Sequence, residues 1–171
     1  MRNPATSCSI GANVRLMRME PAIMLPLRTS FCSTSQAPDA IAKIGLNLNF
    51  DMIASPNVAR LVYDGDGGGD PAAAGPPGSA EIEAAFNTYF DKAGLAYEST
   101  PFDGRSDYDG FTLSGVPAGG LFSGAEEKMS EQQAELWDGK ANEPFDPNDH
   151  KKTDTLDPIE RNALELNGAG G

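Results

Sequence analysis

The first residue whose type and place could do chemistry is Asp51, which ends the most regular apolar segment of the chain, residues 41–52. A carboxylate at the end of a strand in an open α/β sheet faces the crevice in which ligands bind. Asp51 is therefore a candidate ligand-binding residue. The alternative is that it only caps the turn at residues 55–57.

The second candidate is His150, the single histidine of the chain, in the polar loop at residues 146–155. A loop histidine among carboxylates, just before the start of a helix, can act as a metal ligand or a general base. The alternative is an exposed histidine with no role. One histidine also means that a site built only from this chain cannot contain two imidazole ligands.

The third candidate is Arg105, which follows Gly104 at the start of an expected helix. A guanidinium there could bind a carboxylate or a peptide carbonyl with two hydrogen bonds. The alternative is a surface ion pair with Asp103 or Asp107, which would contribute little to stability.

The sequence excludes three other kinds of functional motif. The run of acidic and glycine residues at 64–70 begins like a calcium-binding loop, but Gly75 stands where that loop requires a bidentate glutamate. The same glycines lack the Lys-Ser/Thr pair of a phosphate-binding loop. The chain also has no Gly-x-Ser-x-Gly nucleophile motif.

Strands and helices alternate along the segment that carries these residues. Period-two alternation or short apolar runs predict strands, and apolar spacings of three and four predict helices. The strands are expected at 41–52, 59–63, 95–99 and 116–122, and the helices at 79–92, 106–113, 131–137 and 157–166. Alternation of this kind predicts an α/β sandwich.

Capping residues indicate where three of these helices begin. Ser130 and Gln133 form the spacing of a capping box. Asp157 is expected to cap the last helix, with Pro158 in its first turn. Ser106 is expected to cap the helix that follows Arg105.

The charge of the chain separates two regions. The 171 residues carry a net charge of −12, which makes nucleic acid an unsuitable partner. Residues 1–38 hold four arginines and one glutamate, whereas residues 39–171 hold the remaining nine basic and 24 acidic residues. We predict a basic, unstructured or non-native tail over 1–38 and a folded unit over 39–171.

The tail contains both cysteines, Cys8 and Cys32, so no disulfide is expected in the acidic region. Its longest apolar run, residues 22–25, is short for the core of a signal peptide. No segment of the chain approaches the roughly 18 apolar residues of a membrane-spanning helix, so no membrane association is expected.

Taken together, the ordered motifs resemble one family, the bacterial and fungal secreted di-zinc aminopeptidases of metallopeptidase family 28. The resemblance is to leucine aminopeptidases, over the C-terminal half of their catalytic domain, and it spans about residues 40–166. It implies a three-layer α/β sandwich with a mixed sheet, here incomplete. The motifs that carry it are Asn49–Asn57, Tyr63–Gly67, Gly75–Ser79, Phe102–Tyr108, Val116–Phe122 and His150 with Asp154–Thr155.

The resemblance also implies a chemistry, the removal of N-terminal, mostly apolar, residues from peptides outside the cell. In the family two zinc ions share a bridging aspartate and a water, and a glutamate acts as general base. By resemblance Asp51 ligates one zinc and His150 the other. The residues expected to contact the peptide substrate are Arg105, Gly104, Met52 and Phe122.

The sequence departs from the family pattern at several positions. The family's remaining ligands and its general base come from segments that precede Asp51, where this chain has the basic tail with no histidine and no Glu-Glu pair. Asp149 stands where the family often has a tyrosine that donates to the oxyanion. We therefore predict a zinc aminopeptidase domain that retains no zinc and has no turnover as this chain alone, with a missing N-terminal half. The alternatives are a non-catalytic peptide-binding remnant and a non-functional fragment.

Overall fold

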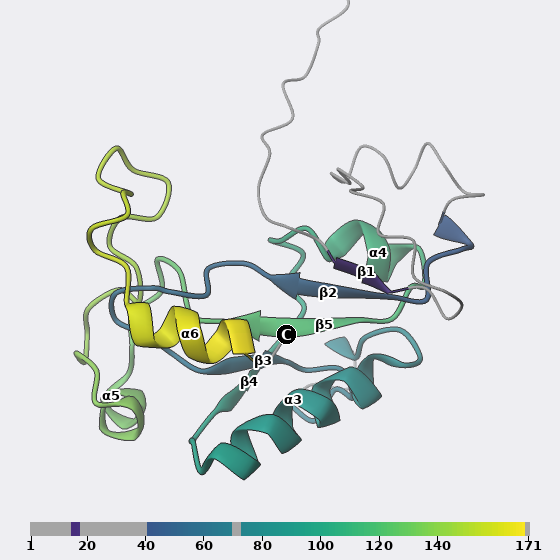
Figure 1. The fold of residues 1–171 in the computed structure, drawn as a ribbon, viewed down its shortest axis with the longest axis horizontal. Helices are drawn as coiled ribbons and strands as arrows, with labels where there is room; N and C mark the ends of the chain where they lie inside the picture. The colour runs from purple at the N-terminus through teal and green to yellow at the C-terminus, as the bar shows by residue number, and fades with distance from the viewer. Residues whose placement is uncertain (1–14, 18–40, 70–72, 170–171) are drawn as a thin grey trace, which may run out of the picture.

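A five-stranded mixed sheet forms the centre of the computed structural model, which describes residues 15–17, 41–69 and 73–169 (Figure 1). In spatial order its strands are β1 (Arg15–Met17), β2 (Leu46–Phe50), β5 (Ala118–Phe122), β3 (Leu61–Tyr63) and β4 (Glu98–Thr100). β2 pairs with β5 in parallel, and β3 pairs with β4 in parallel. β1 is antiparallel to β2, and β3 is antiparallel to β5. The sheet is thus mixed, as the family resemblance implies.

Helix α3 (Ser79–Ala93) packs along one face of the sheet, and α6 (Arg161–Ala169) packs on the same face (Figure 1). The apolar side chains between them come from both helices and from β2, β3 and β5: Leu46, Leu48, Phe50, Val62, Ile82, Phe86, Phe90, Leu121 and Leu166. α3 approaches β5 closely because Gly119 has no side chain, and a Cβ there would lie 2.4 Å from Cγ2 of Ile82.

The opposite face is covered by an aromatic cluster beside α4 (Asp109–Leu113) and by a second cluster beside α5 (Glu131–Trp137). Tyr108 packs edge-on against Tyr63 with ring centroids 4.8 Å apart. Trp137 is buried with Leu61 and Met129. Helices therefore lie on both sides of the sheet.

The strands are shorter than predicted, and two helix starts are wrong. The helix expected from Ser106 begins at Asp109, since the Ser106 hydroxyl bonds to Asp51 instead of capping. The helix expected from Asp157 begins at Arg161, where the Glu160 carboxylate accepts the N–H of Ala163. The capping box at Ser130 is confirmed, with both of its hydrogen bonds present.

Little of the predicted tail falls within the described residues. Strand β1 is part of it and pairs with β2, with Arg15 opposite Leu48. Residues 1–14 and 18–40, including Cys8 and Cys32, lie outside the described residues, so the boundary at residue 38 stays a prediction. No helix within the described part of the chain has the length and apolarity to cross a membrane.

Candidate functional site

All six residues that the sequence singles out line one pocket with a volume of about 860 Å³. They come from four parts of the chain: Asp51 and Met52 after β2, Gly104 and Arg105 before α4, Phe122 at the end of β5, and His150 between α5 and α6. The structure thus brings the candidates together, although they are spread over about a hundred residues of sequence.

The parallel pairing of β2 and β5 explains why Asp51 and Phe122 meet. Phe50 lies opposite Leu121 in the register, so both strands end at the same edge of the sheet. The carboxyl ends of parallel strands form the crevice in which α/β proteins bind ligands. The ladder continues one step further, because the N–H of Ser123 donates to the carbonyl of Met52 at 2.7 Å.

Two buried serines hold the turn that follows Asp51. Met52 has a φ of 50°, a left-handed conformation that is uncommon for a residue with a side chain. The Ser123 hydroxyl donates to the Met52 carbonyl and accepts the N–H of Ser55 at 3.0 Å. The Ser55 hydroxyl lies 2.8 Å from that of Ser123 and donates to the Gly124 carbonyl at 2.6 Å. Both serines are almost fully buried, so this network fixes the backbone that carries Asp51.

A relay of side chains orients the carboxylate of Asp51 itself. The Ser106 hydroxyl donates to Oδ2 of Asp51 at 2.7 Å and accepts from Nδ2 of Asn49 at 2.9 Å. Asn49 is 1% exposed, so its amide can turn little. The carboxylate is thus held toward the pocket by a hydrogen bond rather than used as a cap for the turn at residues 55–57.

The loop before α4 forms the next wall, and a tyrosine hydroxyl organises it. The Tyr108 hydroxyl accepts the N–H groups of Asp103 and Gly104 at 3.0 and 3.1 Å and donates to Oδ1 of Asp103 at 2.7 Å. Gly104 permits the turn because its φ is 78°. Burial, followed by the hydrogen bond and the charge of Asp103, raises the pKa of Tyr108, so the phenol stays protonated.

Arg105 lies at the rim of the pocket and pairs with two carboxylates. Its Nη1 donates to Oε1 of Glu127 at 2.6 Å, and its Nη2 donates to Oε1 of Glu126. Both partners come from the loop after β5, more than twenty residues away in sequence. The alternative of a side-chain pair with Asp103 or Asp107 is wrong, and only the backbone N–H of Arg105 bonds to Asp103.

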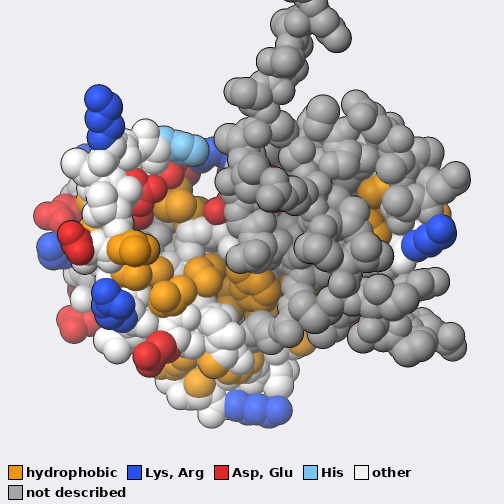
Figure 2. All heavy atoms as spheres, turned by 45° about the horizontal axis from the view of Figure 1, so that its top comes forward, with side chains coloured by type: hydrophobic (Ala, Val, Ile, Leu, Met, Phe, Trp, Pro, Cys, Tyr) orange, Lys and Arg blue, Asp and Glu red, His pale blue; other side chains and the backbone are white. Residues whose placement is uncertain are grey.

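His150 lies on the loop between α5 and α6, with its side chain 96% exposed. Its φ is 55°, and its Nε2 lies 3.8 Å from Oδ1 of Asp149. Figure 2 shows the pale-blue histidine at the surface beside acidic side chains. The histidine reaches the pocket, but described protein atoms leave most of its ring uncovered.

The pocket is strongly acidic. Its carboxylates outnumber Arg105 and His150, the two basic residues of the lining: Asp51, Asp103, Asp107, Asp109, Glu127, Asp149 and Asp154. Burial, followed by the charge of Asp51, raises the pKa of Asp107. The pocket therefore favours neutral or cationic groups.

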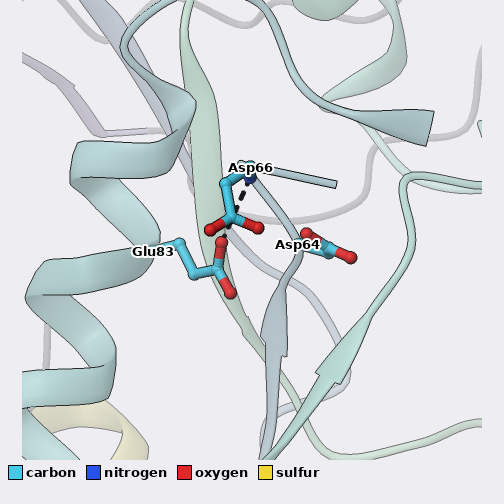
Figure 3. Close-up of side chains that lie close together, drawn as sticks. All are labelled: Asp64, Asp66 and Glu83. Atoms are coloured by element: carbon cyan, nitrogen blue, oxygen red, sulfur yellow. Dashed lines mark hydrogen bonds between the residues drawn. The ribbon is translucent and has the colours of Figure 1, made fainter. Parts of the chain in front are cut away.

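A separate carboxylate cluster lies after β3, beside helix α3 (Figure 3). It consists of Asp64, Asp66 and Glu83, with one carboxylate oxygen of each within 4.8 Å of the others. Backbone N–H groups already bind these oxygens: Glu83 accepts those of Gly65 and Asp66, and Asp64 accepts those of Gly67, Gly68 and Gly69. The cluster therefore shapes the glycine loop.

The hydrogen bonds to Asp64 also set its titration. Burial alone would raise the pKa of this carboxyl, but the N–H groups of Gly69, Gly67 and Gly68 outweigh burial and lower it. The sequence suggested a calcium loop here and the spacing excluded it. The geometry gives the acidic residues a structural use instead.

The residues present do not fit a zinc site by themselves. Among the described residues, neither Asp51 nor His150 belongs to a group of three ligating side chains with atoms within 4.8 Å of one another. Protein zinc sites need three or four protein ligands. Further ligands must therefore complete any zinc site at this pocket.

Several residues at the site were missed by sequence reasoning. Ser106 was interpreted as a helix cap, and no local pattern distinguishes that use from its bond to Asp51. Ser55 and Ser123 are separated by 68 residues, and Arg105 is separated by more than 20 from its two glutamates. Only the tertiary fold brings these groups together.

Comparisons with known proteins agree with the resemblance seen in the motifs. The model of peptidase family M28 matches residues 29–170. A probable lipoprotein aminopeptidase, LpqL, from Mycobacterium tuberculosis is 60% identical over 138 residues, 77% of this chain and 27% of that protein. Leucine aminopeptidase 2 from Arthroderma otae is 46% identical over 144 residues, 84% of this chain and 29% of that protein.

A solved structure shares the fold. The zinc aminopeptidase BSAP from Bacillus subtilis superposes with a TM-score of 0.52 at 19% identity, over 82% of this chain and 30% of that one. The chain thus spans less than a third of the length of these proteins. The match of the family model covers most of the chain, and the chain belongs to peptidase family M28.

Proposed function

We propose that this chain is part of a zinc aminopeptidase, to which it supplies walls of the substrate pocket and one ligand for each of two zinc ions. In this proposal Asp51 binds one zinc and His150 the other. The observation that carries the proposal is that both residues line a single pocket, at the edge of the sheet where β2 and β5 end, in a chain of peptidase family M28.

The substrate side of the pocket supports the same proposal. Phe122 offers an aromatic surface at the end of β5, and Met52 lies beside it in the lining. Arg105 presents N–H donors at the rim, and the acidic lining favours a protonated α-amine over a carboxylate. The substrate proposed is thus the N-terminal end of a peptide.

The test is hydrolysis of leucine p-nitroanilide by the chain alone and by the chain mixed with the upstream region of the mycobacterial relative. We expect no turnover and no retained zinc for the chain alone, because its ligands are incomplete. We expect zinc-dependent turnover in the mixture, and none when the chain carries Asp51→Asn. Turnover by the chain alone with two bound zincs would show that the ligands have been misassigned.

The second candidate is a peptide-binding module without catalysis. It is favoured by the contrast between the substrate-side residues, which line the pocket, and the ligands, which form no group of three within the described part of the chain. Peptide binding by the chain, with no turnover in any mixture, would support it.

We further propose that the protein acts outside the cytoplasm. The mycobacterial relative is described as a probable lipoprotein aminopeptidase, and this supports an exported location. Fractionation of cells that express the complete gene tests the proposal, which recovery in the cytoplasm alone would contradict.

A further inference from the structure

The double ion pair of Arg105 has a consequence for what the pocket can bind. Each terminal nitrogen of the guanidinium donates to a different carboxylate, Nη1 to Glu127 and Nη2 to Glu126. The backbone N–H of Arg105 also bonds to Oδ1 of Asp103 at 3.0 Å. The residue is thus held at its backbone and at the end of its side chain, although the three side chains of the ion pairs are about half exposed.

The charges of this group do not cancel. One guanidinium faces two carboxylates, so the group as a whole carries one negative charge. The hydrogen bonds to Glu126 and Glu127 raise the pKa of Arg105, and the Glu126 pKa is lowered by a backbone N–H and by Arg105. Both shifts favour the charged forms of Arg105 and Glu126.

The hydrogen-bonding capacity of Arg105 is only partly used. A guanidinium has five N–H donors, and one donor on each terminal nitrogen serves the glutamates. The remaining donors can bind a neutral carbonyl oxygen. A ligand carboxylate at the same place would meet repulsion from Glu126 and Glu127 in addition to that from the other carboxylates of the lining.

We propose that Glu126 and Glu127 set the specificity of the pocket by making Arg105 a donor to peptide carbonyls rather than a receptor for carboxylates. The pocket then accepts extended or amidated peptides and disfavours dipeptides with a free carboxylate. This inference rests on the proposed function, since it takes the pocket to bind the N-terminal end of a peptide.

The experiment measures binding of two ligands that differ only in one charge, Leu-Phe amide and Leu-Phe free acid, to the full chain by calorimetry. We expect the chain to bind the amide at least about tenfold more tightly, as like charges within a few ångströms at a half-exposed site require. In the double variant Glu126→Gln/Glu127→Gln the preference should fall by at least about threefold, because Arg105 loses the two carboxylates that pair with it, while the other carboxylates of the lining remain.

A matched control separates this effect from a change in total charge. Glu135→Gln/Glu165→Gln alters net charge by the same amount at two exposed positions outside the pocket lining, and it should keep the preference for the amide. Equal binding of the two ligands by the unmodified chain would overturn the inference while leaving the peptide pocket intact. An unchanged preference in Glu126→Gln/Glu127→Gln would also overturn it. Binding of neither ligand would refute the proposed function, and the inference with it.

Discussion

Replacing Ser106 by alanine tests whether the Asp51 carboxylate is held by the relay from Asn49. The substitution removes one hydroxyl that donates to Oδ2 of Asp51 at 2.7 Å and accepts from Nδ2 of Asn49 at 2.9 Å. Serine and alanine differ only by this hydroxyl group, so the substitution changes nothing else at this position. The effect on folding free energy therefore reports the two hydrogen bonds.

The expected magnitude follows from the surroundings of each partner. A hydrogen bond to a charged group contributes about 1.5–3 kcal/mol, and the half-buried Asp51 belongs in the lower part of that range. Asn49 is 1% exposed, and a buried donor that loses its acceptor costs about 1–3 kcal/mol. Partial relaxation toward water reduces the sum, so we expect Ser106→Ala to lower the free energy of unfolding by about 2–4 kcal/mol.

The assay is unfolding in urea followed by the fluorescence of Trp137, the single tryptophan. The matched control is Ser114→Ala, because Ser114 is exposed and its hydroxyl donates within the same segment, to the carbonyl of Gly110 at 2.7 Å. The control should change stability by less than about 0.5 kcal/mol. If both variants lost the same small amount, the relay would not be what holds Asp51.

Three further predictions concern stability. Asp64→Asn should make the folded chain less stable at neutral pH. Because folding lowers the pKa of Asp64 below 3.8, the stability advantage of the unmodified chain should vanish as the pH falls below that value. Urea midpoints measured across pH check this. Ser123→Ala should lower the free energy of unfolding by about 2–4 kcal/mol in the same assay, since it removes the acceptor of the buried Ser55 N–H and the donor to the Met52 carbonyl. A loss below about 1 kcal/mol would contradict the role of this serine. Gly120→Ala should prevent folding, because its Cβ would lie 1.8 Å from the Asn49 carbonyl oxygen. In contrast, Gly168→Ala on α6 should stabilise the chain by roughly 0.5–1 kcal/mol, since no atom lies within 4 Å of the added Cβ. Circular dichroism and thermal melts of the two variants distinguish these outcomes.

Local sequence signals predicted the elements whose causes are local. The helix at 79–92 has its apolar residues at helical spacing, and it is observed at Ser79–Ala93. The capping box at Ser130 depends on residues three apart and was also correct. Capping at Ser106 was wrong because a partner 55 residues away competes for its hydroxyl.

The local pattern also failed to predict that the polar face of β2 is buried. Alternation along residues 41–52 gives one apolar face with polar residues opposite, yet Asn47 and Asn49 are 0% and 1% exposed. For Asn49 the cause lies elsewhere in the chain, since its Nδ2 donates to the Ser106 hydroxyl in the loop before α4. Local patterns singled out Asp51, Arg105 and His150, and the family motifs gave them their expected roles. The glutamates that pair with Arg105 came only from the fold.

The strand order has a consequence for the synthesis of the chain. β2 and β3 are consecutive in sequence, but β5 lies between them and pairs with both. As the chain leaves the ribosome, these apolar strands must wait for residues 118–122 before the centre of the sheet can close. Such long-range pairing slows folding and leaves strand edges open to other chains in the interval. Nascent chains that stop short of Ala118 should therefore bind chaperones, and release should follow once β5 has emerged.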